Sequence, residues 1–548
     1  MIARIYRFLS RELSGLHEAA FLLGISAFGS AVLALLRDRL LAHTFGATRD
    51  LDIYYAAFSV PDFLNVTIAS FVSVTVLIPF LVKKMAGGEE GKREANRFLS
   101  EILSVYALVM LLVSVVGYVT MPYLSRGIVP SFDARAFGLF VLLSRILLLQ
   151  PFLLGLSNLF GGVTQSLHKF AMFALSPLLY NIGIICGVIF LYPSMGLPGL
   201  VWGVVLGATL HMAIQLPVLV GSGFKLSLTR DIRWREIAEV IKLSLPRSIG
   251  LGMTQLLTIA LFRFASDMQP GSISLFQFAD NLQAVPLGII GVSYSTAAFP
   301  SLARLIKEGK PQLFARHVSL AVRHILYWSF FLSALVFVLA PDLVALFLGS
   351  GRFDASDALV SGIALSLFAF SIAPQGLLLL FTRSYYAAED TAKPVLANSF
   401  SMILTISLAL GLVYLYETMP SFALMFDKFL RLPAGLNHEV LVLPVAFSIG
   451  MIVNALLHWE AFMLDFPGSG RPLFASALRS LTVALLSGAT VYAVHDFFLG
   501  AHPVLDGGLF FGVVLLSLVG LLALILFSYC FAWPELSEVY ASLRSRVG

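Results

Sequence analysis

The stretch GGLFFGVVLLSLVGLLALILFSYCF, residues 507–531, contains no charged residue. A helix needs about 20 mostly apolar residues to cross a bilayer, so this stretch is long enough to span one. Similar stretches recur along the whole chain. Of the 548 residues, 58% are hydrophobic and 12% are charged, whereas soluble domains have about 25% charged residues. Because a soluble fold cannot bury that much apolar surface, the composition predicts an integral membrane protein.

The apolar stretches predict about 14 membrane-spanning helices. Their expected ranges are 19–36, 55–82, 99–122, 136–164, 169–192, 197–220, 240–264, 274–302, 319–340, 358–382, 394–416, 441–464, 475–496 and 507–531. A transmembrane β-barrel would instead show segments of about ten residues with alternating hydrophobicity, and this sequence has none. We therefore expect an all-α polytopic membrane protein.

The basic residues predict the orientation of the chain. Segment 1–18 carries Arg4, Arg7 and Arg11 and lacks a convincing cleavage site, so we interpret it as a retained, cytoplasmic amphipathic segment. With the N-terminus inside, most Lys and Arg residues of the loops also fall inside, as the positive-inside rule requires. Both termini are then cytoplasmic. The net charge of +5 is explained by contact with an anionic leaflet, without nucleic acid.

The longest cytoplasmic connection, 221–239, divides the spans into two groups. We expect an N-lobe of six helices over 19–220, a C-lobe of six helices over 240–464, and two further helices with a cytoplasmic tail over 465–548. The motifs VLIP (76–79) and AAFP (297–300) occupy equivalent places in the second span of each lobe and are each followed by basic residues. This repeated motif favours two pseudo-symmetric lobes, as in transporters built from internal repeats.

The sequence favours transport over catalysis. It contains no G-x-x-x-x-G-K-[ST], G-x-S-x-G or H-E-x-x-H motif. The ten histidines form no cluster with metal-ligand spacing, and Cys186 and Cys530 both lie inside apolar spans. We therefore expect no enzyme activity, bound cofactor, metal site or disulfide.

Charged side chains inside the spans mark the candidate site, because each costs about 3 kcal/mol in the bilayer unless it faces protein or water. The candidates are Arg37, Asp38, Arg39, Asp52, Asp62, Arg145, Arg263 and Asp280. Arg145 lies deep in its span, which favours a cavity-facing position. The alternative for Arg37, Arg39, Asp52 and Arg263 is that they are close enough to an interface to snorkel. The basic residues around Arg37 fall on the outer side against the positive-inside trend, which suggests an anionic ligand. Asp38 is equally well explained as their internal counter-ion.

Prolines within spans predict kinks or gates. They are Pro61, Pro151, Pro177, Pro286 and Pro374, and kinked helices suit a protein that opens to two sides in turn. Among them we single out Pro61 and Pro286 as gate positions. The loop 382–393, with Arg383 and Asp390, is expected to form a hinge between two spans, although a merely solvated turn explains the same residues.

Several stretches resemble the MurJ family, the lipid II flippases of the multidrug/oligosaccharidyl-lipid/polysaccharide exporter superfamily. They follow the family order over about two-thirds of the chain. The matching segments are LRD (36–38), FGA (45–47) with Asp52, AFSVP (57–61), QSLHKF (165–170) with Pro177 and Asn181, FADN (278–281), PLG (286–288), PSL (300–302), GRFD (351–354), FTRSYYAAEDT (381–391) and KPV (393–395).

The resemblance implies a two-lobed transporter of fourteen helices in the bacterial inner membrane. It would move a polyprenyl-diphosphate-linked peptidoglycan precursor from the inner to the outer leaflet by alternating access. A cationic cavity would hold the diphosphate, and a groove near the last two helices would accept the lipid tail. Membrane lipids and envelope-synthesis proteins are the implied partners, and a cation or the membrane potential would drive the cycle.

The sequence departs from the family at several cavity positions. Arg37 is kept, but Ala31, Asn65 and Asn281 stand where basic residues are typical. Arg145 and Arg263 are candidates to restore the lost charge, with Asp38 and Asp52 orienting the arginines and Asp280 beside Asn281.

Three other functions remain open at this point. They are a flippase for another lipid-linked glycan, an ion-coupled exporter of small amphiphiles that uses Asp52, Asp62 or Asp280 as its ion site, and a scaffold that binds envelope-synthesis proteins without transport.

Overall fold

The computed structural model describes residues 16–432, 438–466, 470–499 and 508–538. In these ranges the regular structure is helical, and the single bridge of β type, Ser350–Phe353, closes a turn. The all-helical prediction is therefore confirmed. Most of the expected amphipathic segment 1–18, and the end of the C-terminal tail, lie outside the described residues.

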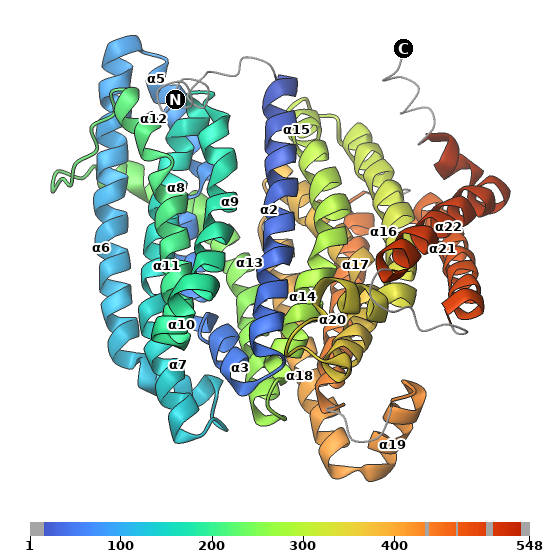
Figure 1. Cartoon of the computed structure of the whole chain (residues 1–548). Coiled ribbons are helices and arrows are strands. Elements are labelled where there is room, and N and C mark those ends of the chain that lie inside the picture. Colours follow the sequence, from blue (N-terminus) through green and yellow to red (C-terminus); the bar gives the residue numbers. More distant parts are fainter. Residues whose placement is uncertain (1–15, 433–437, 467–469, 500–507, 539–548) are drawn as a thin grey trace. The chain divides into compact units, whose positions relative to one another are not determined.

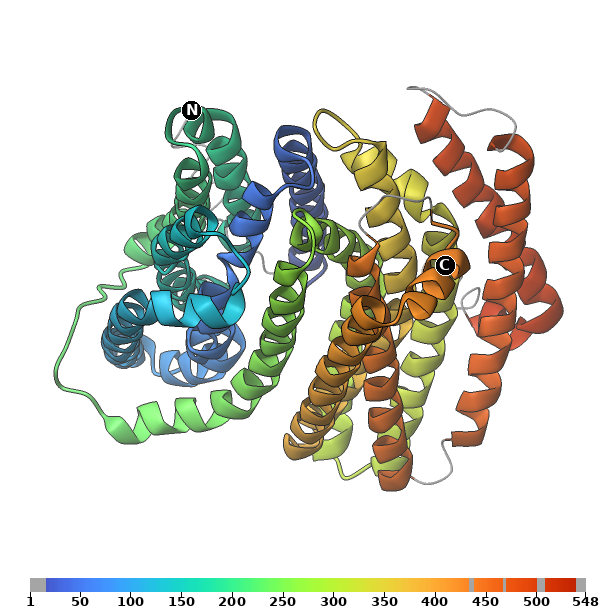
Figure 2. The ribbon, with the colours of Figure 1, turned by 90° about the horizontal axis from the view of Figure 1, so that it is seen from below.

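The chain forms two compact units, Met1–Ile273 and Ser274–Gly548. Figures 1 and 2 show the first unit as a bundle of helices, coloured from blue to green along the chain. The helices are α2 (Leu16–Phe45), α3 (Arg49–Ala56), α4 (Ser59–Thr67), η1 (Ala69–Val72), α5 (Val74–Met85), α6 (Gly88–Ile128), α7 (Ala134–Leu147), α8 (Leu149–Ser166), α9 (Phe170–Cys186), η2 (Gly187–Leu191), α10 (Tyr192–Met195), α11 (Leu197–Ala213), α12 (Leu216–Gly221) and α13 (Trp234–Asp267).

The second unit is built around the long helix α16, which packs on α17 and α21. Its elements are α14 (Ser272–Leu287, whose first two residues belong to the first unit), η3 (Gly288–Val292), α15 (Ser293–Lys307), α16 (Pro311–Leu348), α17 (Ala355–Ala387), α18 (Ala392–Thr418), α19 (Pro420–Phe429), η4 (Glu439–Leu441), α20 (Val442–Asp465), α21 (Gly470–Leu499) and α22 (Gly508–Phe531).

Among the described residues, 12 helices are long and apolar enough to cross a membrane. They correspond to the third to fourteenth expected spans. The first expected span, 19–36, lies within the 30-residue helix α2. The count is consistent with the expected total of about 14, and the chain is a multi-pass membrane protein.

The second expected span, 55–82, is not one continuous helix. It is divided into α4, η1 and α5, and Ser73 adopts an extended backbone (φ −65°, ψ 144°) directly before α5. The run of β-branched and hydroxyl residues from Val66 to Val76 has low intrinsic helix propensity. A hydropathy window cannot detect such a break, because every piece remains apolar.

The helix α13 belongs to the first unit, where it packs on α4 and α6. Figure 2 shows that it bends between its first and second halves. Only Ser248–Asp267 has the composition of a span, and Pro246 lies just before it, where a proline removes a helical hydrogen bond. The lobe boundaries expected from the sequence remain a prediction.

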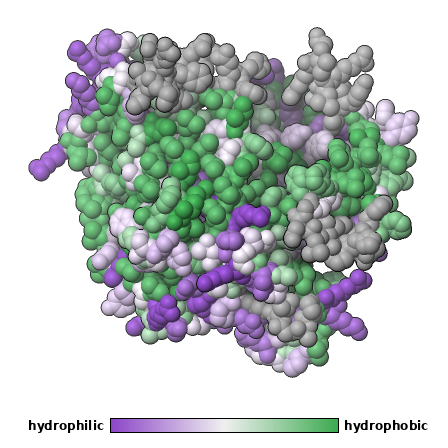
Figure 3. Space-filling view, viewed as in Figure 1, coloured by the Kyte–Doolittle hydropathy of each residue, from purple (hydrophilic) through white to green (hydrophobic). Residues whose placement is uncertain are grey.

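Two neighbouring helices of the first unit, α9 and α11, approach each other through glycines. A Cβ on Gly183 would lie 2.2 Å from the Cα of Gly207, so no larger residue fits at this crossing. Small residues allow such close backbone contact in membrane bundles. Figure 3 shows that the outer surface over α8, α9 and α11 is almost continuously apolar.

Candidate functional site

Arg37 lies near the end of α2 in a polar cluster. Its Nε donates to Asp38 Oδ1 at 2.9 Å, and its Nη1 donates to Asn181 Oδ1 at 3.3 Å. Asn181 on α9 in turn donates to the Ser30 hydroxyl at 3.3 Å. The Asp38 side chain is 5% exposed and that of Arg37 is 20% exposed. Asp38 is therefore paired with Arg37, and part of the Arg37 side chain remains accessible.

Asp52 holds a different part of the first unit together. It is fully buried on α3 and accepts the backbone N–H of Gly271 at 2.6 Å. Gly271 has φ +97°, and a Cβ there would lie 2.4 Å from the carbonyl oxygen of Ala47, so only glycine fits. Arg49 lies 3.9 Å from Asp52. Among the described ion pairs, the basic partner of Asp52 is thus Arg49.

The structure does not join Arg145 and Arg263 to Arg37 by any described contact. Arg145 on α7 donates to the carbonyl oxygen of Tyr118 at 3.0 Å, and its guanidinium lies 4.3 Å from the centre of the Tyr118 ring. Arg263 pairs with Asp267 one turn later in α13. The partner of Arg145 lies on another helix, so the sequence of one span did not identify it. The partner of Arg263 lies four residues along the same helix.

A second polar group of the first unit surrounds Asp62 on α4. Gln150 on α8 donates its Nε2 to Asp62 Oδ1 at 3.2 Å and lies 3.3 Å from the Tyr180 hydroxyl of α9. Pro61 precedes Asp62 in the first turn of α4, and Asn65 lies half-buried nearly one turn later. Gln150 and Tyr180 carried no charge signal, so the sequence alone did not select them.

The candidate residues of the second unit lie on α14. Asp280 accepts a hydrogen bond from Gln283 at 2.7 Å, and Asn281 accepts one from Gln277 at 2.7 Å. Gln283 is also bound by the Ser371 hydroxyl of α17 at 2.8 Å. Pro286 comes just before η3, a π-helical turn. Such turns often mark functional positions within helices.

The loop expected to act as a hinge forms a structured turn. Asp390 Oδ1 accepts the backbone N–H of Ala392 at 3.0 Å, and Lys393 binds Asp465 of α20 at 2.6 Å. Arg383 donates to the Thr296 hydroxyl. The turn therefore ties α17, α18 and α20 together within the second unit, and its role in transport remains a prediction.

The segment between α12 and α13 lies extended along α6. The side chain of Asn96 binds both backbone groups of Lys225, at 2.8 and 3.0 Å. The backbone N–H groups of Ser227 and Thr229 donate to Ser100 Oγ at 3.2 Å and Ser104 Oγ at 2.8 Å. Two extended residues advance about 6.6 Å and four helical residues about 6 Å, so the two periods match. We call these contacts the linker clamp.

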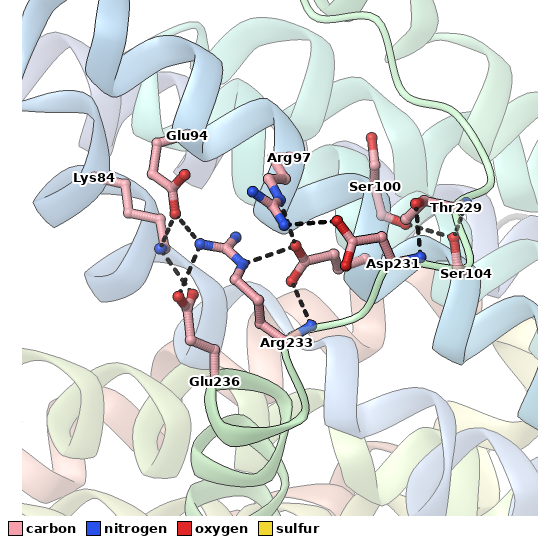
Figure 4. Close-up of polar contacts among 10 residues, drawn as sticks. Lys84, Glu94, Arg97, Ser100, Ser104, Thr229, Asp231, Arg233 and Glu236 are labelled. Carbon is pink, nitrogen blue, oxygen red and sulfur yellow. Dashed lines mark hydrogen bonds and ion pairs between the residues drawn. The ribbon is translucent and has the colours of Figure 1, made fainter.

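An ion-pair network closes the linker clamp at its α13 end (Figure 4). Glu101, which is fully buried, is bound by Arg97 Nε at 3.1 Å and by Arg233 Nε at 2.8 Å. Arg97 also binds Asp231 at 2.8 Å. Burial lowers the pKa of Arg233, but the hydrogen bonds to Glu94 and Glu101 outweigh this effect and raise the pKa. The sequence predicted a linker here but not the α6 residues that hold it.

An apolar groove lies along the last two helices of the second unit. It has a volume of about 610 Å³, and its lining comes from α21 and Phe527 of α22. The α21 residues are Leu486, Ala489, Thr490, Ala493, Val494 and Phe497. A groove of this composition fits a hydrocarbon chain.

Comparison with known sequences identifies relatives over most of the chain. The sequence model of the family described as "Lipid II flippase MurJ" matches residues 41–505. A "Probable lipid II flippase MurJ" of Rhizobium tropici is 24% identical over 508 residues, which cover 88% of this chain and 94% of that protein. The "Lipid II flippase MurJ" of Burkholderia cenocepacia is 24% identical over 85% of this chain and 95% of its own.

Solved structures with the same fold support this grouping. One described as "Lipid II flippase MurJ, inward closed conformation" has a TM-score of 0.73 at 22% identity, covering 94% of this chain and all of that one. An inward-facing multidrug resistance transporter of the MATE family, from the MOP superfamily, has a TM-score of 0.61 at 15% identity. It covers 79% of this chain and 95% of its own. At these identities the likeness concerns the fold.

Proposed function

We propose that this chain, which belongs to the lipid II flippase MurJ family, moves lipid II from the inner to the outer leaflet of a bacterial inner membrane. The family is one of transporters, so the chain is not an enzyme. A large polar head group cannot cross hydrocarbon unaided, which makes a protein-lined route necessary. In this proposal both termini and the linker clamp lie on the cytoplasmic side.

The observation that carries the proposal is the placement of Arg37. A guanidinium has five N–H groups, and the contacts with Asp38 and Asn181 use only some of them. The remaining N–H groups, on a side chain that is 20% exposed, are available to a diphosphate oxygen. Arginine suits this ligand because its planar fork donates in pairs.

The second unit supplies a place for the lipid tail in this proposal. The groove between α21 and α22 is lined almost entirely by apolar side chains. Burying a methylene group there gains about 0.8 kcal/mol. The polyprenyl chain would therefore stay in an apolar environment while the head group crosses.

The test separates a cargo ligand from a structural partner at Arg37. We expect Arg37→Ala to abolish growth of a flippase-depleted bacterium and also to reduce the amount of folded protein, because Asp38 loses its ion partner. The double variant Arg37→Ala/Asp38→Asn should restore the folded amount but not growth. Arg37→Lys should restore growth in part, since lysine lacks the paired fork. If the double variant supported full growth, Arg37 would only neutralise Asp38 and the proposal would be wrong.

A further inference from the structure

Three candidate aspartates of the first unit, Asp38, Asp52 and Asp62, differ in their partners. Asp38 is paired with Arg37, and Asp52 accepts the backbone N–H of Gly271 and lies near Arg49. Asp62 instead meets the neutral amide of Gln150. Within the described part of the chain, no Lys, Arg or His nitrogen forms an ion pair with Asp62. A carboxylate in such a place is costly when charged and much less costly when protonated.

Gln150 provides a second, independent observation. Its side chain is almost completely buried, and its Nε2 is already directed to Asp62 and Tyr180. Its Oε1 is buried without a hydrogen-bond partner among the described residues. Buried acceptors are rarely left in this state. A charged carboxylate has no proton to offer to this oxygen, whereas a protonated Asp62 has one.

We propose that Asp62 is a proton-binding site of the first unit. A proton from water forms an O–H bond with one carboxylate oxygen, and the charge of the side chain changes from −1 to 0. Once the Gln150 amide rotates about its terminal bond, the new O–H donates to Gln150 Oε1. Release of the proton to water reverses both changes, so no other reactant is needed.

The titratable and charged groups near Asp62 lie on neighbouring helices of the first unit. Tyr54 of α3 and Tyr180 of α9 interact electrostatically with Asp62. Both tyrosines also interact electrostatically with Arg37 of α2. Tyrosine hydroxyls are neutral below about pH 10 and arginine is always charged. Asp38 of α2 also interacts with Tyr54, and it is paired with Arg37. His211 of α11 lies edge-on to Tyr180 and binds Ser157 through Nδ1 at 2.7 Å.

The experiment measures protonation directly and needs no cargo, so its failure is distinct from failure of the proposed function. The full chain is reconstituted in liposomes, and infrared difference spectra are recorded between about pH 5.5 and alkaline pH, a range in which exposed carboxyl groups stay charged. Protonated carboxyl groups give a C=O band that histidine does not produce. We expect Asp62→Asn to remove a component of this C=O band that corresponds to one carboxyl group per chain. The matched control Asp496→Asn, at an exposed position of α21, should leave that component unchanged.

A second variant tests the role of Gln150. Gln150→Leu removes both the N–H that binds the charged carboxylate and the Oε1 that accepts from the protonated form. Because a hydrogen bond to a charged group is the stronger of the two, the midpoint of the Asp62 component should move to higher pH. The proposal is overturned if Asp62→Asn leaves the spectrum as it was, or if Gln150→Leu leaves the midpoint unchanged. Because the Gln150 variant retains Asp62, it provides a test even where Asp62→Asn fails to fold.

Discussion

At the scale of single residues, Glu101 carries the network that closes the linker clamp. It is fully buried and binds both Arg97 and Arg233, whereas the Glu94 side chain is 38% exposed. We expect Glu101→Gln to lower the free energy of unfolding by about 2 kcal/mol, because a neutral amide at this buried position makes weaker hydrogen bonds to the two arginines than the carboxylate does. Glu94→Gln should cost less than about 1 kcal/mol. Thermal denaturation in detergent compares the two, and equal losses would contradict this assignment.

Glu535, which follows α22, gives a pH-dependent prediction. It is buried, and it accepts hydrogen bonds from Arg479 at 2.7 Å and Ser476 at 2.6 Å on α21. Burial favours the neutral acid, but these hydrogen bonds outweigh it and lower the pKa of Glu535. A lowered pKa stabilises the folded state above the unfolded value of about 4.3. That stabilisation is lost as the pH falls through the folded value.

We therefore expect segment 533–538 to detach from α21 as the medium is acidified below the unfolded pKa of glutamate, about 4.3. Limited proteolysis across a pH series measures this step. Glu535→Gln should reduce the pH dependence of cleavage to the part that comes from Glu538, which pairs with Arg323 of α16. Glu308→Gln, at an exposed position, should preserve the full pH dependence. A wild-type profile that stays flat down to pH 2 would rule the mechanism out.

At the scale of elements, the linker clamp should control the exposure of the segment before α13. Each of its hydrogen bonds contributes about 1 kcal/mol. The triple variant Asn96→Ala/Ser100→Ala/Ser104→Ala should therefore speed hydrogen exchange at the amides of 225, 227 and 229. Ser125→Ala on the same helix is the control, because that hydroxyl bonds within α6 to Met121. Unchanged exchange in the triple variant would show that the ion pairs alone hold the linker.

The groove between α21 and α22 gives the second prediction for an element. Ala489 lies in its lining, so Ala489→Trp should fill the groove and abolish growth of a flippase-depleted bacterium. Leu522→Trp on α22, at a position that is 68% exposed and outside the lining, should support growth. Equal amounts of both proteins in the membrane make the comparison valid. If Ala489→Trp grew normally, the lipid tail would have to take another path.

At the scale of the whole molecule, the distribution of basic residues predicts the orientation. In a chain with Cys186 and Cys530 replaced by serine, a cysteine at the exposed Ser227 should react with an impermeant thiol reagent only after the cells are opened. A cysteine at Thr418, at the end of α18, should react in intact cells. Labelling of position 227 from outside would reverse the proposed topology.

The sequence by itself determined the membrane class, the helical fold and most span positions. These depend on the number of apolar residues in each window, which is a local property. The order of the family motifs likewise lies in the chain itself. The same local reasoning missed the break between α4 and α5, because hydropathy does not report backbone conformation.

The tertiary structure decided which polar groups meet. Arg37 binds Asn181 of α9, Asp62 binds Gln150 of α8, and Glu101 binds Arg233 directly before α13. Each of these contacts joins residues far apart in the chain, and their partners include neutral amides that no charge pattern marks. Arg145 binds Tyr118 and Arg263 binds Asp267, and no described contact joins either arginine to the Arg37 cluster. The physical reason is that a polar or charged side chain inside the protein needs a hydrogen-bond or ion partner within reach. Helix packing, and not spacing along the chain, determines which partner that is.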